Sequence, residues 1–186
     1  MKNSYFRKWT ALLIVAGMLA SIGTGLIYVY RQLTLEKEIV EFEDKRDTQD
    51  ILDMFQRDWH WLVSSEDYSP QFTLKYRTPN QDLKNIGRLK IKVIRKDENM
   101  VGFIAYYMKT ATNGFLLFLD VNPSYRGKGY SEKLIKYALD DFKKLGATTV
   151  RLVTRTTNLH AQNLYKRLGF HETSRDDGYV WFQKLL

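Results

Sequence analysis

Residues 10–30 contain no charged side chain, although 27% of the residues in this 186-residue chain are charged. A helix of about 20 residues crosses the hydrocarbon core of a bilayer, so a run of this length can span a membrane. Aromatic residues such as Trp9 and Tyr30 stand at both ends of the run, as is usual where a membrane helix meets the interface. We therefore expect four parts: an N-terminal flank over 1–9, a transmembrane helix over 10–30, a juxtamembrane linker over 31–38 and a folded domain over 39–186.

A cleaved signal peptide is the competing interpretation of the same run. The apolar core of a signal peptide is usually about 7–15 residues long, which is shorter than this run. The best small-residue cleavage site, from Ser21 to Gly23, also lies inside the run rather than after it. An uncleaved anchor is therefore the better prediction.

Gly17, Ser21 and Gly25 recur at every fourth position and share one face of the expected helix. Small residues at this spacing let two membrane helices approach closely, which predicts a homodimer through this face. The alternative is that small residues are simply frequent in membrane helices. Lys and Arg residues flank both ends of the run, so their distribution does not fix the orientation in the membrane.

The net charge of +8 raises the question of a nucleic-acid-binding protein. The basic residues are scattered and no recognised binding motif is present, so no nucleic-acid partner is expected. The chain has no cysteine, which excludes thiolate zinc sites and cysteine nucleophiles. No metal is expected.

The apolar pattern after residue 38 alternates between strands and helices. A first helix is expected to be capped by Asp47 or Thr48, and a last one by Thr157 or Asn158. Strands followed by strand–helix–strand units indicate an α/β sheet with mixed pairing. The first helix would bury Ile51, Phe55, Trp59 and Leu62, another helix covers 132–145, and strands are expected over 39–43, 89–95, 101–109, 115–121, 148–154, 170–174 and 179–185.

The segment from Val121 to Ser131 joins a buried strand to a helix and carries most of the chemical information. Gly127 and Gly129 permit a tight turn with exposed amides, and such amides at a helix N-terminus bind phosphate. A Walker loop is excluded because no Gly-Lys-Ser/Thr ending is present. A dinucleotide fingerprint is excluded because its third glycine is missing. The remaining interpretation is the pyrophosphate loop of an acyl-CoA transferase.

This loop and a second segment, from Asn158 to Phe170, resemble the GCN5-related N-acetyltransferase (GNAT) superfamily. In that family a loop of pattern Gln/Arg-x-x-Gly-x-Gly/Ala binds the CoA pyrophosphate, and Ser131 departs from it because Gly or Ala is usual there. The resemblance covers residues 39–186 and implies a mixed, mostly antiparallel central sheet flanked by helices. It implies acetyl-CoA as cosubstrate, bound by Leu119, Val121, Arg126, Gly127, Lys128, Gly129, Tyr130, Ser131, Asn158 and Tyr165.

The resemblance also implies direct transfer of an acetyl group to a primary amine. Backbone N–H groups around Leu119–Val121 would stabilise the developing oxyanion, and Tyr165 would protonate the departing thiolate as a general acid. By its helix pattern alone, Tyr165 would be a core residue. Asp120 is the candidate general base because it is the only charged residue in the strand 115–121. The alternative is that Asp120 is a turn acid before Asn122.

Two functions therefore remain open. The first is a membrane-anchored N-acetyltransferase that acts on a small-molecule or protein amine, and Tyr165 favours it. The second is a non-catalytic, membrane-tethered module that binds acyl-CoA or a protein partner, and Ser131 favours it. Because acetyl-CoA is made and used mainly in the cytosol, the domain is expected on the cytoplasmic side of the membrane.

Overall fold

The computed structural model describes residues 38–79 and 87–186, and Ile39–Leu186 form one compact unit. The predicted flank, transmembrane helix and dimerisation face, with Gly17, Ser21 and Gly25, lie outside the described residues. Among the described residues, no helix has the length and apolar character that a membrane span requires.

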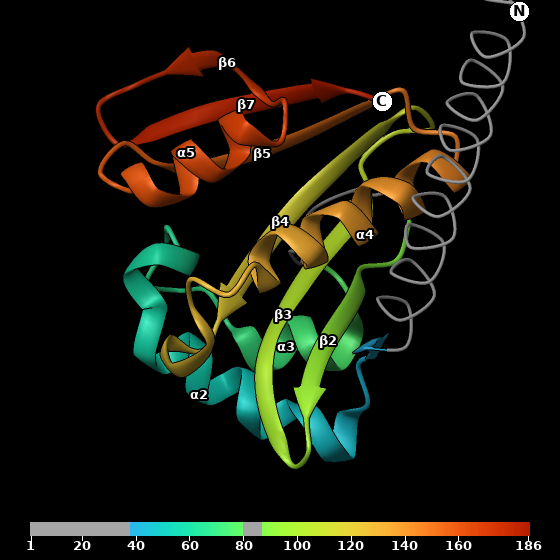
Figure 1. The fold of residues 1–186 in the computed structure, drawn as a ribbon, viewed down its shortest axis with the longest axis vertical. Coiled ribbons are helices and arrows are strands. Elements are labelled where there is room, and N and C mark those ends of the chain that lie inside the picture. The colour runs from blue at the N-terminus through green and yellow to red at the C-terminus, as the bar shows by residue number, and fades with distance from the viewer. Residues whose placement is uncertain (1–37, 80–86) are drawn as a thin grey trace, which may run out of the picture. The chain divides into compact units, whose positions relative to one another are not determined.

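The core of the domain is a seven-stranded sheet in the order β1-β2-β3-β4-β5-β7-β6 (Figure 1). Every neighbouring pair is antiparallel except β4 and β5, which run parallel. The predicted mixed, mostly antiparallel sheet is therefore confirmed. The strands are β1 (Ile39–Glu41), β2 (Lys90–Lys96), β3 (Asn99–Met108), β4 (Asn113–Val121), β5 (Thr149–Arg155), β6 (His171–Arg175) and β7 (Tyr179–Leu185).

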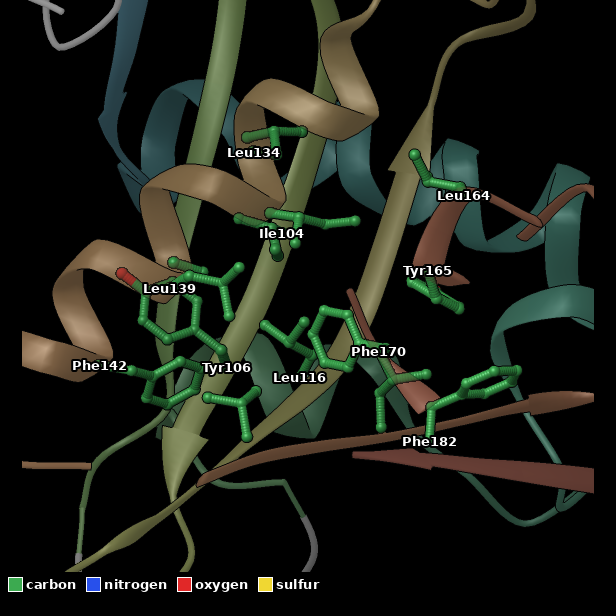
Figure 2. Close-up of a cluster of buried hydrophobic side chains, with 14 of the residues drawn as sticks. Ile104, Tyr106, Leu116, Leu134, Leu139, Phe142, Leu164, Tyr165, Phe170 and Phe182 are labelled. Carbon is green, nitrogen blue, oxygen red and sulfur yellow. The ribbon is translucent and has the colours of Figure 1, made fainter. Parts of the chain in front are cut away.

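Helices cover both faces of this sheet, so the domain has two hydrophobic layers. On one face, α2 (Asp44–Leu62) and α3 (Pro70–Tyr76) cover residues of β2, β3 and β4. On the other face lie α4 (Tyr130–Lys144) and α5 (Leu159–Arg167), and a short 3-10 helix, η1 (Pro123–Tyr125), precedes α4. Figure 2 shows the second layer, where Leu134, Leu139 and Phe142 of α4 pack over Ile104 and Tyr106 of β3.

The first helix begins earlier than the sequence predicts. It starts at Asp44, after Glu43 at its N-cap, whereas a cap at Asp47 or Thr48 was expected. Asp47 lies inside the first turn, is fully buried, and its Oδ2 accepts a hydrogen bond from the Glu43 N–H at 2.8 Å. The acidic side chain thus satisfies a free amide from within the helix rather than from the residue before it.

The two parallel strands separate soon after they begin. β4 and β5 pair only from Asn113–Thr149 to Phe115–Arg151, and Figure 1 shows them diverging beyond that point. Between Phe118 and Leu116 the register of β4 against β3 shifts, which leaves Leu117 as the extra residue of a β-bulge. A bulge bends and twists its strand, so the end of β4 turns away from β5 and leaves backbone groups unpaired along its edge.

Candidate functional site

A cavity of about 640 Å³ opens where β4 and β5 diverge. Its walls come from the end of β4, the loop before α4, the start of α5 and the end of α2. Two separate segments therefore face the same space. They are the loop from Val121 to Ser131, called the glycine loop below, and the segment that begins at Asn158. Of the predicted site residues, Leu119, Asp120, Val121, Arg126, Gly127, Ser131, Asn158 and Tyr165 line this cavity.

The backbone of β4 presents N–H groups along the cavity edge. The Asn122 N–H donates to Val101 O on β3 at 2.9 Å, and donors alternate between the two edges of a strand. The N–H groups of Leu119 and Val121 therefore point away from β3, toward the cavity. The Asp120 Oδ1 accepts the Val121 N–H at 2.7 Å. Leu119 is thus the better candidate of the two for stabilising an oxyanion.

The loop before α4 fits an anionic phosphate. Gly127 and Gly129 have φ values of +75° and +83°. Apart from each glycine and its two chain neighbours, no described residue has an atom within 4 Å of the position that a Cβ would occupy. Only glycine adopts this conformation without strain, and the open space lets a ligand approach the backbone. Gly129 is the N-cap of α4, so the first N–H groups of that helix, from Tyr130 and Ser131, are available there.

Two residues of this loop direct their side chains elsewhere. The Lys128 ammonium donates to Ser124 O at 3.0 Å and lies over the Tyr125 ring. The Tyr130 side chain is buried in the core, where it packs against Tyr125. Neither side chain lines the cavity, so Tyr130 offers it a backbone amide only.

Arg126 is engaged by carboxylates on the cavity wall. Its Nη2 donates to Asp58 Oδ2 at 2.8 Å and to Asp120 Oδ1 at 3.3 Å, and its Nε donates to Val121 O at 2.8 Å. On the other side, Arg57 donates to Asp120 Oδ2 at 3.0 Å and to Asp58 Oδ2 at 2.7 Å. Two acids and two guanidiniums thus alternate in one cluster that joins α2, β4 and the glycine loop.

The pKa values of the two carboxylates in this cluster are shifted in opposite directions. Burial raises the pKa of Asp120 to about 7, and the nearby Asp58 charge adds to the rise, although Arg57, the Val121 N–H and Arg126 oppose it. Burial also acts to raise the pKa of Asp58, but the hydrogen bond from Arg57 and the charges of Arg126 and Arg57 outweigh burial and lower it. Asp58 is thus held as a carboxylate, while Asp120 exchanges a proton near neutral pH.

Tyr165 lies at the inner side of the cavity, on α5. Its ring packs against Phe170 and Phe182 with centroids 6.0 and 5.9 Å apart (Figure 2), so it is also the core residue that the helix pattern indicates. Burial raises the pKa of the Tyr165 phenol to about 12, which keeps it protonated. Asn158 caps α5, and its Oδ1 accepts the Ala161 N–H at 3.1 Å.

The sequence analysis missed Asp58 and Arg57. A signal was present, because Asp58 follows Ile51 and Phe55 in the apolar stripe of α2, where an acid is unexpected. The backbone of Asp58 is non-helical (φ −111°, ψ 25°). This kink explains why the predicted buried face of the helix is wrong in its last turn, where Trp59 and Leu62 are only half-buried and Asp58 is buried instead.

Arg155 was also missed, and it connects two walls of the cavity. At the end of β5, its guanidinium donates to His60 O and, at 3.0 Å, to Val63 O at the end of α2. It also lies over the Tyr179 ring, 5.4 Å from its centroid. These contacts satisfy free carbonyl groups at the helix terminus and hold α2 against β5 and β7.

Comparisons with known proteins agree with this geometry. A model of the acetyltransferase (GNAT) family matches residues 48–170. The bovine thialysine N-epsilon-acetyltransferase is 32% identical over 88 residues, which are 45% of this chain and 52% of that protein. The [ribosomal protein bS18]-alanine N-acetyltransferase of Haemophilus ducreyi is 29% identical over 91 residues, covering 49% of this chain and 61% of the relative.

A solved structure supports the fold. The PaiA N-acetyltransferase of Thermoplasma acidophilum, in complex with coenzyme A, superimposes with a TM-score of 0.62 at 20% identity over 80% of this chain and 98% of that one. The chain spans about half the length of the bovine relative that it matches. Because the family model matches well over half of the chain, the chain belongs to the acetyltransferase (GNAT) family, as its two motifs predict.

Proposed function

We propose that this protein is a membrane-anchored N-acetyltransferase that moves an acetyl group from acetyl-CoA directly to a primary amine. The observation that carries the proposal is the cavity itself, where the glycine loop, the Leu119 N–H, Asp120 and Tyr165 face one space. The two relatives are named for acetylating amines, one of thialysine and one of a ribosomal-protein alanine. A primary amine is the acceptor chemistry that both names share.

In this proposal the loop amides of residues 127–131 hold the pyrophosphate of acetyl-CoA, which supplies the activated acetyl group as a thioester. The Leu119 N–H stabilises the negative charge that develops on the thioester oxygen when the amine attacks. Asp120 accepts a proton from the attacking nitrogen, and Tyr165 donates one to the departing sulfur. One C–N bond forms, one C–S bond breaks, and the products are an amide and a free thiol.

The test of this function uses the full chain in detergent micelles, with acetyl-CoA and a panel of amines that includes lysine, peptides with free N-termini and small polyamines. Thiol release is read with a thiol reagent, and the cysteine-free protein contributes no signal. We expect amine-dependent release. Measurable CoA binding without release from any amine would instead favour the non-catalytic binding module.

The glycine loop gives a prediction for CoA binding. Gly129→Ala should raise the CoA dissociation constant about tenfold or more, because its Cβ projects into the open space over the loop, where the pyrophosphate would lie. The strain of a Cβ at positive φ, about 1–2 kcal/mol, lowers the folding stability as well. Titration calorimetry measures the change in CoA affinity. Gly146→Ala is the matched control: Gly146 has φ +85° at the other end of α4 and equally open surroundings. It should lose similar stability and keep CoA affinity, and equal affinity losses in both variants would contradict the loop assignment.

The anchor and the cytoplasmic placement of the domain are part of the same proposal. They rest on the uncharged run over 10–30 and on the cytosolic supply of acetyl-CoA. In intact spheroplasts we expect an added protease to leave residues 39–186 uncut until the membrane is permeabilised, as read by immunoblotting. Digestion before permeabilisation would place the domain on the outer side and contradict the proposal.

A further inference from the structure

A second cavity, of about 490 Å³, lies at the end of β3 that is remote from the proposed active site. Met108 contributes to it from the end of β3, Leu89 from just before β2, and Leu145 from just after α4. Phe42 and Arg77 contribute from either end of the α2–α3 segment. It shares no described lining residue with the first cavity, so the proposed reaction does not account for it.

Arg77 is the distinctive residue of this pocket. It terminates α3 in the left-handed conformation (φ 54°, ψ 44°), which costs energy for a residue with a side chain. Its N–H donates to Thr73 O at 3.0 Å and its carbonyl accepts from Leu89 N at 2.9 Å. The backbone of Arg77 is thus fixed on both sides, so its side chain leaves the chain at a defined point beside the pocket.

The Arg77 guanidinium is only partly satisfied. It stacks over the Phe42 ring at 4.0 Å, and its Nη2 lies 3.3 Å from Oδ1 of the exposed Asp44. Its Nη1 is buried and has no hydrogen-bond partner among the residues that the structure describes. A buried donor without a partner carries a free-energy cost, so this nitrogen is a candidate ligand for a bound acceptor.

The charges around Arg77 favour an anion. Burial lowers the pKa of Arg77, and the positive charge of Arg88 lowers it further, although the negative charges of Asp44 and Glu41 oppose both effects. Two guanidiniums therefore repel one another in the same pocket. The other charged lining residues are already paired, Lys90 with Asp141 at 2.8 Å and Glu41 with Lys92.

We propose that this pocket binds a phosphate group, with Arg77 and Arg88 as its ligands. Guanidinium matches the geometry of phosphate oxygens in bidentate hydrogen bonds, and a dianion between the two side chains would convert their repulsion into attraction. The phosphate can come from a lipid headgroup or from a soluble phosphate ester. A lipid source deserves its own arm in the test, because lining residues Glu41 and Phe42 follow the predicted span closely in the sequence.

The first measurement is the thermal unfolding midpoint of the full chain in micelles, in sodium phosphate and in sodium chloride of equal ionic strength. At a phosphate concentration well above the dissociation constant, we expect phosphate to raise the midpoint by about 5 °C. Arg77→Met and Arg88→Met should each remove most of this shift. Arg167→Met is the matched control, because Arg167 is exposed on α5 and lines neither cavity.

Phosphate bound at the glycine loop would stabilise all four proteins alike, so an equal shift in wild type, Arg77→Met and Arg88→Met would overturn the proposal. Arg88 is exposed, so its variant tests the site even if Arg77→Met folds poorly. The second arm measures hydrogen exchange of residues 38–44 and 87–91 in phosphatidylcholine vesicles with and without phosphatidylglycerol. Protection by phosphatidylglycerol that Arg88→Met abolishes assigns a lipid source; a phosphate shift without such protection assigns a soluble one.

Discussion

Replacing Asp120 with asparagine is expected to lower kcat for amine acetylation by roughly 10²–10⁴-fold, the usual contribution of a general base. Wild-type kcat should rise with pH through a midpoint near 7, because the pKa of Asp120 is raised to about 7 and only the carboxylate can accept a proton. Below that midpoint the base is protonated and activity is lost. In Asp120→Asn this midpoint should disappear, whereas the titration of a lysine-like acceptor, near pH 10, remains.

Asp58→Asn separates this role from a merely structural one. The negative charge of Asp58 is the second-largest contribution to the raised pKa of Asp120, after burial. Without the Asp58 charge, Arg57 and Arg126 have Asp120 as the only carboxylate partner that remains in the cluster. Both effects lower the pKa of Asp120, so the midpoint of the kcat profile should move to lower pH. If Asp120→Asn keeps the wild-type rate and midpoint, Asp120 is not the base.

The acidic pair illustrates what the sequence does not reveal. A glycine loop or a capped helix can be predicted from the sequence because each depends on residues that are neighbours in the chain. The strands and helices predicted in this way lie within a few residues of their expected bounds. The contact between Asp58 and Arg126 joins residues 68 positions apart. It depends on the kink at Asp58 and on where β4 ends, and neither follows from periodicity.

Arg126 shows the same limit within a motif that was recognised. Its position in the loop suggests a charge for the CoA pyrophosphate, and that role remains a prediction. In the structure the guanidinium bonds two carboxylates and the Val121 carbonyl instead. The arginine side chain is long enough to reach either the pyrophosphate or the carboxylates. Its position in the motif therefore determines where the side chain begins but not which group it binds. The acids that hold it come from α2 and β4.

Replacing Tyr165 with phenylalanine is expected to lower kcat by roughly 10²-fold or more while leaving CoA affinity unchanged. The substitution keeps the ring that packs on Phe170 and Phe182, so stability should change little. With a pKa of about 12, the Tyr165 hydroxyl stays protonated between pH 6 and 9, so its loss should scale the rate equally across that range. Stopped-flow or steady-state thiol release measures kcat at each pH, and titration calorimetry measures the CoA affinity.

The decisive comparison uses a second acetyl donor whose leaving thiol is more acidic than CoA. A thiolate of lower pKa departs with less help from an acid, so the deficit of Tyr165→Phe should shrink with that donor. A structural role for Tyr165 would slow both donors by the same factor. Tyr76→Phe is a suitable control because Tyr76 is exposed on α3 and does not line the first cavity; it should match wild type with both donors. If Tyr165→Phe loses as much rate with the activated donor as with acetyl-CoA, Tyr165 is not the general acid and is only the core residue that its helix pattern predicts.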